Sequence, residues 1–327
     1  MVIYRNSNTD PFFNLASEQY LLDTKDGDIF MLWRNAPSVI IGKNQNAYAE
    51  LDIDYVEKNN IKVVRRLTGG GAVFHDTGNV NFSFITSDKE ESALDFAKFT
   101  APIIKALSSM GLENVSLSGR NDIMAGDFKI SGNAQSSYNG KILHHGTLLY
   151  SADLSTLAKA LTVDPEKIKA KGIKSVRNRV GNIKELMSTD MDVIEFMSRI
   201  EDCISEETSS IPQEFTCEDK QNIQALADAK YSTWEWNYGK SKEYTAEKKR
   251  RYCFGGVSVK LSVDNGIIKD VKIFGDFFGS DDIKEIEDSL VGIKYNRIGI
   301  ESALDAKKLG RCISGMEISD MTELLLS

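Results

Sequence analysis

The stretch Arg65–Asp76 has the sequence Arg-Arg-Leu-Thr-Gly-Gly-Gly-Ala-Val-Phe-His-Asp and connects two strand-like apolar runs. Three consecutive glycines are costly to order, because each loses more backbone freedom on folding than any other residue. A chain keeps them where the backbone bends sharply or where a ligand touches it directly. Arginines just before such a turn offer rigid cationic forks that suit phosphate or carboxylate. The stretch therefore predicts an anion-binding turn, with a purely structural turn as the alternative.

The composition of the chain argues against several classes of protein. Its 40 Lys and Arg against 48 Asp and Glu give a net charge of −8, whereas a nucleic-acid binder needs a basic surface. The chain has no run of eighteen apolar residues and no signal-peptide pattern, so we expect no membrane partner and a cytoplasmic protein. The cysteines form no metal-binding pair and no disulfide framework; they are Cys203, Cys217, Cys253 and Cys312.

Strand-like and helix-like runs alternate along the chain and predict a mixed α+β protein. Asp10-Pro11 marks a helix start, and Asn139-Gly140 is a strong hairpin signal. The charged stretch Tyr238–Arg251 predicts a boundary, followed by a small α+β unit with a hairpin around Asp264-Asn265-Gly266. We expect strands near 29–33, 38–41, 61–64, 72–74, 80–85, 115–117, 128–131, 142–150, 252–263 and 266–274, and helices near 11–26, 51–59, 94–110, 154–161, 193–204, 282–290 and 300–309.

Three further segments carry side chains that could take part in chemistry. Gly119–Asp122 ends in an amide and a carboxylate, which suit a Mg²⁺ ion that bridges phosphates, although Asn-Asp by itself is more often a turn. Lys129 begins a short apolar run, so its ammonium group either projects into a cleft or faces solvent. His144 and His145 are adjacent on a predicted strand and point to opposite faces, which excludes joint binding of one metal. The chain has no P-loop, no dinucleotide fingerprint and no nucleophile elbow.

Taken together, these segments resemble the lipoate–protein ligases of the biotin and lipoate ligase family. Five motifs occur in that family's order, at Arg65–Asn79, Gly119–Asp122, Lys129–Ala134, His144–Leu149 and Lys171–Val180. The resemblance covers about residues 1 to 245, and the remainder resembles the family's small accessory domain. It implies a catalytic domain over 1–243, with mainly antiparallel or mixed sheets packed by helices, and a small α+β domain over 244–327.

The resemblance also implies a two-step reaction that scavenges lipoate. Lipoate and MgATP first give lipoyl-AMP and pyrophosphate. The lipoyl group then passes to one lysine of an acceptor domain, in a 2-oxo-acid dehydrogenase subunit or the glycine-cleavage H protein. ATP, Mg²⁺ and lipoate are therefore the expected small molecules, and fixed positive charge is the main catalytic need, because attack of a carboxylate on a phosphate joins two anions.

Site residues follow from the resemblance position by position. Lys129 matches the lysine that contacts both the lipoyl carbonyl and the phosphate, and is the expected catalytic residue, as an electrostatic clamp and not a nucleophile. The loop Lys171–Val180 matches the family's adenylate-binding loop. Besides Lys129, the expected ATP and adenylate contacts are Arg66, Gly71, Ala72, Val73, Phe74, Asn121 and Asp122, with Asp122 as a Mg²⁺ ligand; the expected lipoate contacts are Gly70, Gly71, His75 and His145.

Three alternatives stay open. The first is an acyltransferase that moves octanoyl or lipoyl groups from a carrier protein, although related transferases use a cysteine nucleophile and no cysteine lies in these motifs. The second is biotin ligase, whose Gly-Arg-Gly-Arg motif is replaced here by Arg66–Gly71. The third is a non-catalytic protein that binds lipoate or a nucleotide.

Overall fold

The computed structural model describes residues 1–87, 95–161, 180–238, 246–264 and 266–327. Its largest element is a mixed eight-stranded sheet in the order β11-β1-β2-β6-β10-β9-β8-β7. The first two pairings are parallel and the other five are antiparallel. The strands are β1 (Val2–Arg5), β2 (Ile29–Arg34), β6 (Asn79–Ser87), β7 (Val115–Ser118), β8 (Asp122–Ala125), β9 (Phe128–Tyr138), β10 (Lys141–Leu149) and β11 (Pro212–Glu214).

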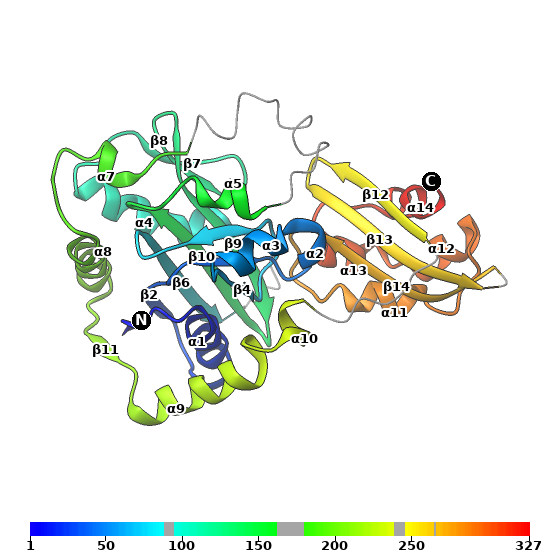
Figure 1. The fold of residues 1–327 in the computed structure, drawn as a ribbon, viewed down its shortest axis with the longest axis horizontal. Coiled ribbons are helices and arrows are strands. Elements are labelled where there is room, and N and C mark those ends of the chain that lie inside the picture. The colour runs from blue at the N-terminus through cyan, green and yellow to red at the C-terminus, as the bar shows by residue number, and fades with distance from the viewer. Residues whose placement is uncertain (88–94, 162–179, 239–245, 265) are drawn as a thin grey trace.

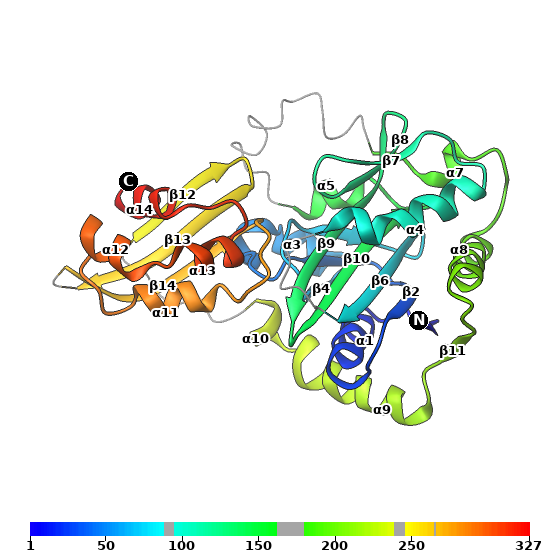
Figure 2. The same ribbon diagram turned by 180° about the vertical axis from the view of Figure 1, so that it is seen from behind.

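Helices cover both faces of this sheet (Figures 1 and 2). On one face, α4 (Phe96–Ser109), α7 (Ile183–Leu186) and α8 (Val193–Thr208) close an apolar core around Phe82, Phe84 and Phe99. On the other face, α1 (Pro11–Thr24), α9 (Cys217–Leu226) and the π-helix η1 (Ala227–Tyr231) form a second core. The predicted start of α1 is confirmed, because the Asp10 carboxylate accepts a hydrogen bond from the Phe12 amide and Pro11 opens the helix.

A small sheet lies on the α1 side of the large sheet and carries the glycine stretch. Its order is β4-β3-β5, with β3 (Ser38–Ile41), β4 (Lys62–Arg65) and β5 (Val73–His75). One face of this sheet packs toward α1 through Ile40 and Val64. The other face packs, through Val39, Ile41 and Val63, against the short helices α2 (Ala47–Glu50), α3 (Ile53–Lys58) and α5 (Thr156–Ala160). The glycine stretch is thus the connection between β4 and β5.

The C-terminal unit lies at one end of the molecule, beyond α2 and α10 (Trp234–Asn237) (Figure 1). It packs one antiparallel sheet of β12 (Ala246–Tyr252), β13 (Gly255–Asp264) and β14 (Ile267–Gly275) onto a core of its own. Its helices are α11 (Lys284–Leu290), α12 (Arg297–Ala303), α13 (Ala306–Cys312) and α14 (Ile318–Leu326). The predicted fold class, a large mixed α+β body with a small α+β unit, is confirmed.

Three expectations about elements need correction. The helix expected over 300–309 is two helices, because the Asp305 side chain caps a new one by accepting from the Lys308 amide. A strand that was not expected, β12, begins within the charged stretch at Ala246 and pairs with β13, while the boundary expected near 238–251 stays a prediction. The strand expected over 128–131 continues to Tyr138, because β10 pairs with it along its length.

Candidate functional site

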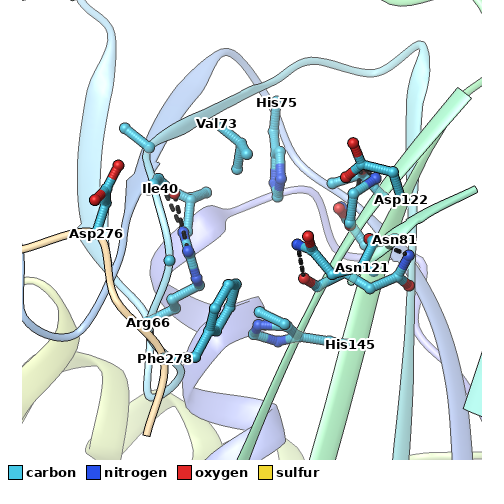
Figure 3. A pocket seen from close by; sticks show the side chains of 18 of the residues that line it. Ile40, Arg66, Val73, His75, Asn81, Asn121, Asp122, His145, Asp276 and Phe278 are labelled. Atoms are coloured by element: carbon cyan, nitrogen blue, oxygen red, sulfur yellow. Dashed lines mark hydrogen bonds between the residues drawn. The ribbon is translucent and has the colours of Figure 1, made fainter. Parts of the chain in front are cut away.

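A cavity of about 310 Å³ opens between the two sheets of the larger body and the C-terminal unit. Figure 3 shows His75 from β5, Asn81 from β6 and His145 from β10 converging on it, with Phe278 of the C-terminal unit at its edge. Its lining comprises Leu15, Trp33, Ile40, Arg66, Gly70, Gly71, Ala72, Val73, His75, Asn81, Asn121, Asp122, Lys129, Gly132, Asn133, Ala134, His145, Gly146, Thr147, Asp276 and Phe278.

The cavity changes character from one end to the other. Leu15, Trp33 and Ile40 are at most 2% exposed and form an apolar floor. At the mouth, the side chains of Lys129 and Asp122 are 35% and 34% exposed. A site with a charged, wet mouth and a dry apolar floor fits an elongated molecule with an anionic head and an apolar tail.

The two arginines before the glycines have different surroundings. Arg65 is outside the cavity; its guanidinium donates to backbone carbonyls of Gly42, Gln45 and Asn237 and so ties β4 to α10 and the loop after β3. Arg66 lines the cavity and is 5% exposed. Arg65 is the last residue of β4 and Arg66 directly follows it, and adjacent residues of an extended chain point to opposite sides, which separates the pair.

The guanidinium of Arg66 holds the glycine turn through hydrogen bonds. It donates to the Thr68 hydroxyl (3.0 Å) and to the carbonyls of Ile40 (3.1 Å), Gly69 (2.6 Å) and Gly71 (2.9 Å). Burial lowers the pKa of the guanidinium to about 10, so the group stays charged at neutral pH. The turn therefore rests on a buried positive charge, which makes the cavity attractive to anions.

Lys129 and Asp122 form the charged pair at the mouth. The ammonium nitrogen lies 2.7 Å from Oδ1 of Asp122. Next to it, the amide of Asn121 donates to the Asn133 carbonyl (2.7 Å), and the Asn133 backbone amide donates back to the Asn121 carbonyl (2.9 Å). These bonds fix the end of β8 against β9 and hold the carboxylate within reach of the lysine.

His145 is held by a chain of hydrogen bonds beneath the cavity. Its Nε2 lies 2.7 Å from the Thr68 hydroxyl, and its Nδ1 lies 2.9 Å from Oε1 of the fully buried Glu18. The Ser83 hydroxyl donates to the same carboxylate oxygen at 2.6 Å. Both ring nitrogens are therefore engaged by protein groups. His144, on the opposite face of β10, stacks on Phe99 with ring centroids 5.0 Å apart, so the predicted divergence of the two histidines is confirmed.

His75 projects from β5 into the space between Arg66, Asn121 and His145 (Figure 3). It is 3% exposed, and its Nδ1 lies 3.1 Å from the amide nitrogen of Asn35. Burial, followed by the charges of Arg66 and His145, lowers its pKa to about 3. The ring is therefore neutral at physiological pH.

The C-terminal unit completes the site at the glycine turn. The backbone amide of Gly70 donates to the carbonyl of Phe277 at 3.2 Å. The Phe278 ring lies beneath the Arg120 guanidinium, 4.2 Å from its centroid, and edge-on to Phe96. Asp276 and Phe278 line the cavity, a contribution that nothing in their local sequence signalled.

The structure brings most of the predicted site residues together. Arg66, Lys129 and the Asn121-Asp122 pair line one cavity with Gly70–Val73 and with both expected histidines, His75 and His145. Phe74 is not among the lining residues and its side chain packs with the core around Val39 and Ile41, whereas the contact expected of it is through its backbone. The expected adenylate-binding loop lies, except for Val180, outside the described residues. The floor residues Leu15, Trp33 and Ile40 were not predicted as site residues, because their apolar segments cannot be distinguished in the sequence from segments of the hydrophobic core.

The described residues form no permanent metal site. Among them, no group of three or more His, Cys, Asp or Glu side chains is placed to bind one ion. Asp122 alone is a fitting donor for a Mg²⁺ that arrives on a nucleotide, because such an ion takes one or two carboxylates and keeps waters and phosphates. Within the same described residues, no helix has the length and apolar character to cross a membrane.

Two family models match the chain. Residues 10–205 match the lipoyl protein ligase A/B catalytic domain, and residues 241–325 match the bacterial lipoate protein ligase C-terminus. The chain is 44% identical to lipoate–protein ligase 1 of Staphylococcus aureus, over 99% of each chain. It is 43% identical to the lipoate-protein ligase LplJ of Bacillus subtilis, over 99% of this chain and 100% of the relative.

Solved structures of lipoate ligases are also similar to this chain. The Plasmodium falciparum LipL1, in complex with lipoate, superposes with a TM-score of 0.81 at 25% identity, covering 99% of each chain. A bipartite lipoate protein ligase of Thermoplasma acidophilum, studied with its E2 lipoyl domain, gives 0.64 at 30% identity, over 75% of this chain and 98% of that one. A lipoate-protein ligase A bound with ATP gives 0.61 at 30% identity, over 73% and 98%. With two matching family models and full-length relatives above 40% identity, this chain belongs to the lipoate–protein ligase family.

Proposed function

We propose that this ligase joins lipoate to ATP as lipoyl-AMP and then transfers the lipoyl group to a lysine of an acceptor domain. The observation that carries the proposal is the gradient of the cavity, with Lys129 at the mouth and an apolar floor at Trp33. A lipoate carboxylate belongs beside the ammonium, and its hydrocarbon chain and dithiolane belong on the floor. The lipoate-bound and ATP-bound relatives support the two small molecules.

In the first step, a carboxylate oxygen of lipoate attacks the α-phosphorus of ATP, and pyrophosphate leaves. Lys129 screens the two anions from each other, and the buried charge of Arg66 adds to the positive field beneath the glycine turn. We assign the nucleotide contacts to Arg66 and the backbone of Gly71–Phe74, with Asn121 and Asp122 near the phosphates. Mg²⁺ enters as part of the substrate, and Asp122 is its proposed protein ligand.

In the second step, the amine of the acceptor lysine attacks the acyl carbon, an amide forms and AMP leaves. Lys129 then stabilises charge on the carbonyl oxygen and on the departing phosphate. An adenylate is already an activated acyl donor, so this route needs no enzyme nucleophile. All four cysteines lie in the described chain, and none is among the residues that line the cavity.

We propose lipoyl domains of 2-oxo-acid dehydrogenase complexes, the glycine-cleavage H protein, or both as acceptors. The E2 lipoyl domain studied with the archaeal relative supports this class of partner. Incubation with lipoate, MgATP and each apo acceptor, read by intact mass, tests the proposal. One added lipoyl group that depends on ATP is expected. Transfer from octanoyl carrier protein without ATP would instead identify a carrier-dependent acyltransferase, and lipoate binding without transfer would identify a binding protein.

Lys129→Ala is expected to lower lipoate-dependent pyrophosphate release by about 100- to 1000-fold, the usual effect of removing one donor that stabilises a transition state. Thermal unfolding should change little, because the side chain is about one-third exposed and its ion pair is at the surface. Lys129→Arg serves as the control that keeps the charge. An alanine variant with near-normal release would remove the assigned role of Lys129.

A further inference from the structure

His75 presents one hydrogen-bonding atom that the protein leaves unused. Its Nε2 is buried and has no hydrogen-bond partner among the described residues, although the ring lines the cavity. His145, the other histidine of the cavity, has both ring nitrogens engaged, by Thr68 and Glu18. A buried polar atom without a partner lowers the stability of the fold unless a ligand or a water makes the missing hydrogen bond. Of the two rings, His75 is therefore the one that can bond a ligand.

A chain of amides decides what this atom offers. The Asn6 amide donates to Oδ1 of Asn14 (2.9 Å), and the Asn14 amide donates to Oδ1 of Asn35 (2.9 Å). The Asn35 amide then faces Nδ1 of His75 at 3.1 Å. Because the amide nitrogen can only donate, Nδ1 must accept. In the neutral ring the proton then sits on Nε2, so His75 offers the cavity an N–H donor.

The direction of this chain cannot be reversed by flipping the amides. The Asn14 amide nitrogen also lies 2.9 Å from the Asn8 carbonyl and 2.8 Å from the Arg34 carbonyl. Backbone carbonyls only accept, so Asn14 is fixed, and Asn35 must keep its oxygen toward Asn14. Asn14 and Asn35 are both fully buried, which keeps water from replacing these bonds. The tautomer of His75 is thus set by the two backbone carbonyls that orient Asn14.

The donor lies beside the apolar floor, which the proposed function assigns to the acyl tail. The His75 and Trp33 rings are edge to face, with centroids 6.0 Å apart, and Trp33 belongs to the apolar floor. With the carboxylate head at Lys129, the distal end of the acid lies against this floor. Lipoate carries two sulfur atoms there, which are weak acceptors, whereas octanoate has the same carbon chain and only C–H groups.

We propose that the His75 Nε2–H group contacts the dithiolane of lipoate and discriminates it from sulfur-free acids, and that Asn35 is a positioning residue that keeps this proton in place. The inference rests on the proposed function. Octanoate would leave the buried N–H unpaired, whereas sulfur would accept its hydrogen bond. Because sulfur accepts weakly, we expect a preference of roughly tenfold from this contact.

Two variants of His75 isolate the donor. His75→Gln keeps an N–H at the same reach, and His75→Met has a similar length without a donor. Pyrophosphate release with lipoate and with octanoate gives kcat/KM for each acid, and calorimetry gives the two dissociation constants without turnover. We expect the lipoate-to-octanoate ratio to fall roughly tenfold in His75→Met and to be largely kept in His75→Gln. An equal loss for both acids in His75→Met would overturn the proposal.

Asn35→Asp tests the positioning role, because a carboxylate only accepts and draws the proton to Nδ1. The ¹⁵N spectrum of histidine-labelled protein at alkaline pH should show the switch of tautomer, and the acid ratio should fall as in His75→Met. Adding His75→Gln to Asn35→Asp should restore the ratio, since its amide needs no tautomer. A switched tautomer with an unchanged ratio refutes the role. If Asn35→Asp does not fold, the comparison of His75→Met with His75→Gln tests the proposal without it.

A wild-type protein that binds both acids but releases no pyrophosphate would contradict the proposed function. The lipoate-to-octanoate ratios of the dissociation constants would still test the role of His75.

Discussion

Gly71 differs from the two glycines before it in what surrounds its Cα. A Cβ at Gly69 would overlap the Phe277 carbonyl oxygen, and Gly70 has a φ of +94° with Arg66 and Phe278 each 3.0 Å from where its Cβ would be. At Gly71 nothing lies within 4 Å, and its φ is not positive. The fold therefore explains the first two glycines and leaves the third to a ligand that approaches the backbone.

Gly71→Ala should fold normally and lose activity, because a methyl group would push the nucleotide out of place. We expect kcat/KM for ATP to fall roughly 100-fold, the effect of a displacement of about 1 Å. Gly310→Ala is the matched control, since Gly310 also has nothing within 4 Å but lies in α13, away from the cavity lining. Pyrophosphate release and thermal unfolding of both variants provide the measurement. Wild-type kinetics in Gly71→Ala would show that no ligand contacts this position.

Site residues that belong to short sequence motifs could be predicted from the sequence. The glycine turn, Lys129 and the Asn121-Asp122 pair each sit in a short motif, and the cavity collects all of them. The sequence could not place Phe278 at the same cavity, because that contact joins segments about two hundred residues apart. Nor could it find the unused Nε2 of His75, which depends on bonds running back through Asn35 to the N-terminal segment.

At the scale of elements, the β9–β10 hairpin supports the cavity through both of its strands. Asn139 and Gly140 form its turn with φ of 50° and 72°, the two left-handed conformations of a type I′ turn. Gly140→Ala should lower the free energy of unfolding by about 1 kcal/mol, because a side chain is strained at positive φ. Asn139→Gly is the control and should be close to neutral. Urea unfolding checks both, and an unaffected Gly140→Ala would mean that the turn relaxes.

Elements without a clean periodic signal were the ones that the sequence could not predict. Strand β11 is a short edge strand and β1 is the short strand beside it, and their pairing is long-range, since Ile3 lies opposite Pro212. Helix α9 is mostly exposed, with Asp219 and Ile223 as its buried residues, so its apolar stripe is weak. In contrast, α1 and the Asn139-Gly140 hairpin carry strong local signals, and these predictions are confirmed.

At the scale of the whole molecule, the C-terminal unit contacts the glycine turn at Gly70, next to the backbone that the nucleotide is proposed to use. The Gly70 amide is bonded to Phe277, the Gly275 amide donates to the Asn44 carbonyl at 2.7 Å, and Lys43 lies 3.1 Å from Asp282. The exposed ion pair contributes little, about 1 kcal/mol at most. A ligand that bonded the Gly70 amide would therefore have to displace the Phe277 carbonyl and compete with these contacts.

The larger body should lose stability as the pH falls from about 6.5 toward 4, because two of its histidines are buried in the neutral state. Burial lowers the pKa of His75 and of His144 to about 3. In the unfolded chain each ring takes up a proton near pH 6.5, so falling pH favours unfolding until the folded pKa is reached. Each histidine contributes up to about 1.4 kcal/mol per pH unit in this window.

His144→Phe separates the two contributions. The ring of His144 is already stacked on Phe99, so phenylalanine fits the same aromatic cluster and carries no proton. Urea unfolding of the larger body at pH 6.5 and 4.5 should show about half the wild-type loss of stability attributable to the two rings. The same loss in the variant and the wild type would mean that His144 is not held neutral by the fold. Asp153 and Asp219 add little in this window. Hydrogen bonds from Thr156 and Ser155 lower the pKa of Asp153, and hydrogen bonds outweigh burial to lower the pKa of Asp219, but the unfolded carboxyls take up protons only near pH 3.8.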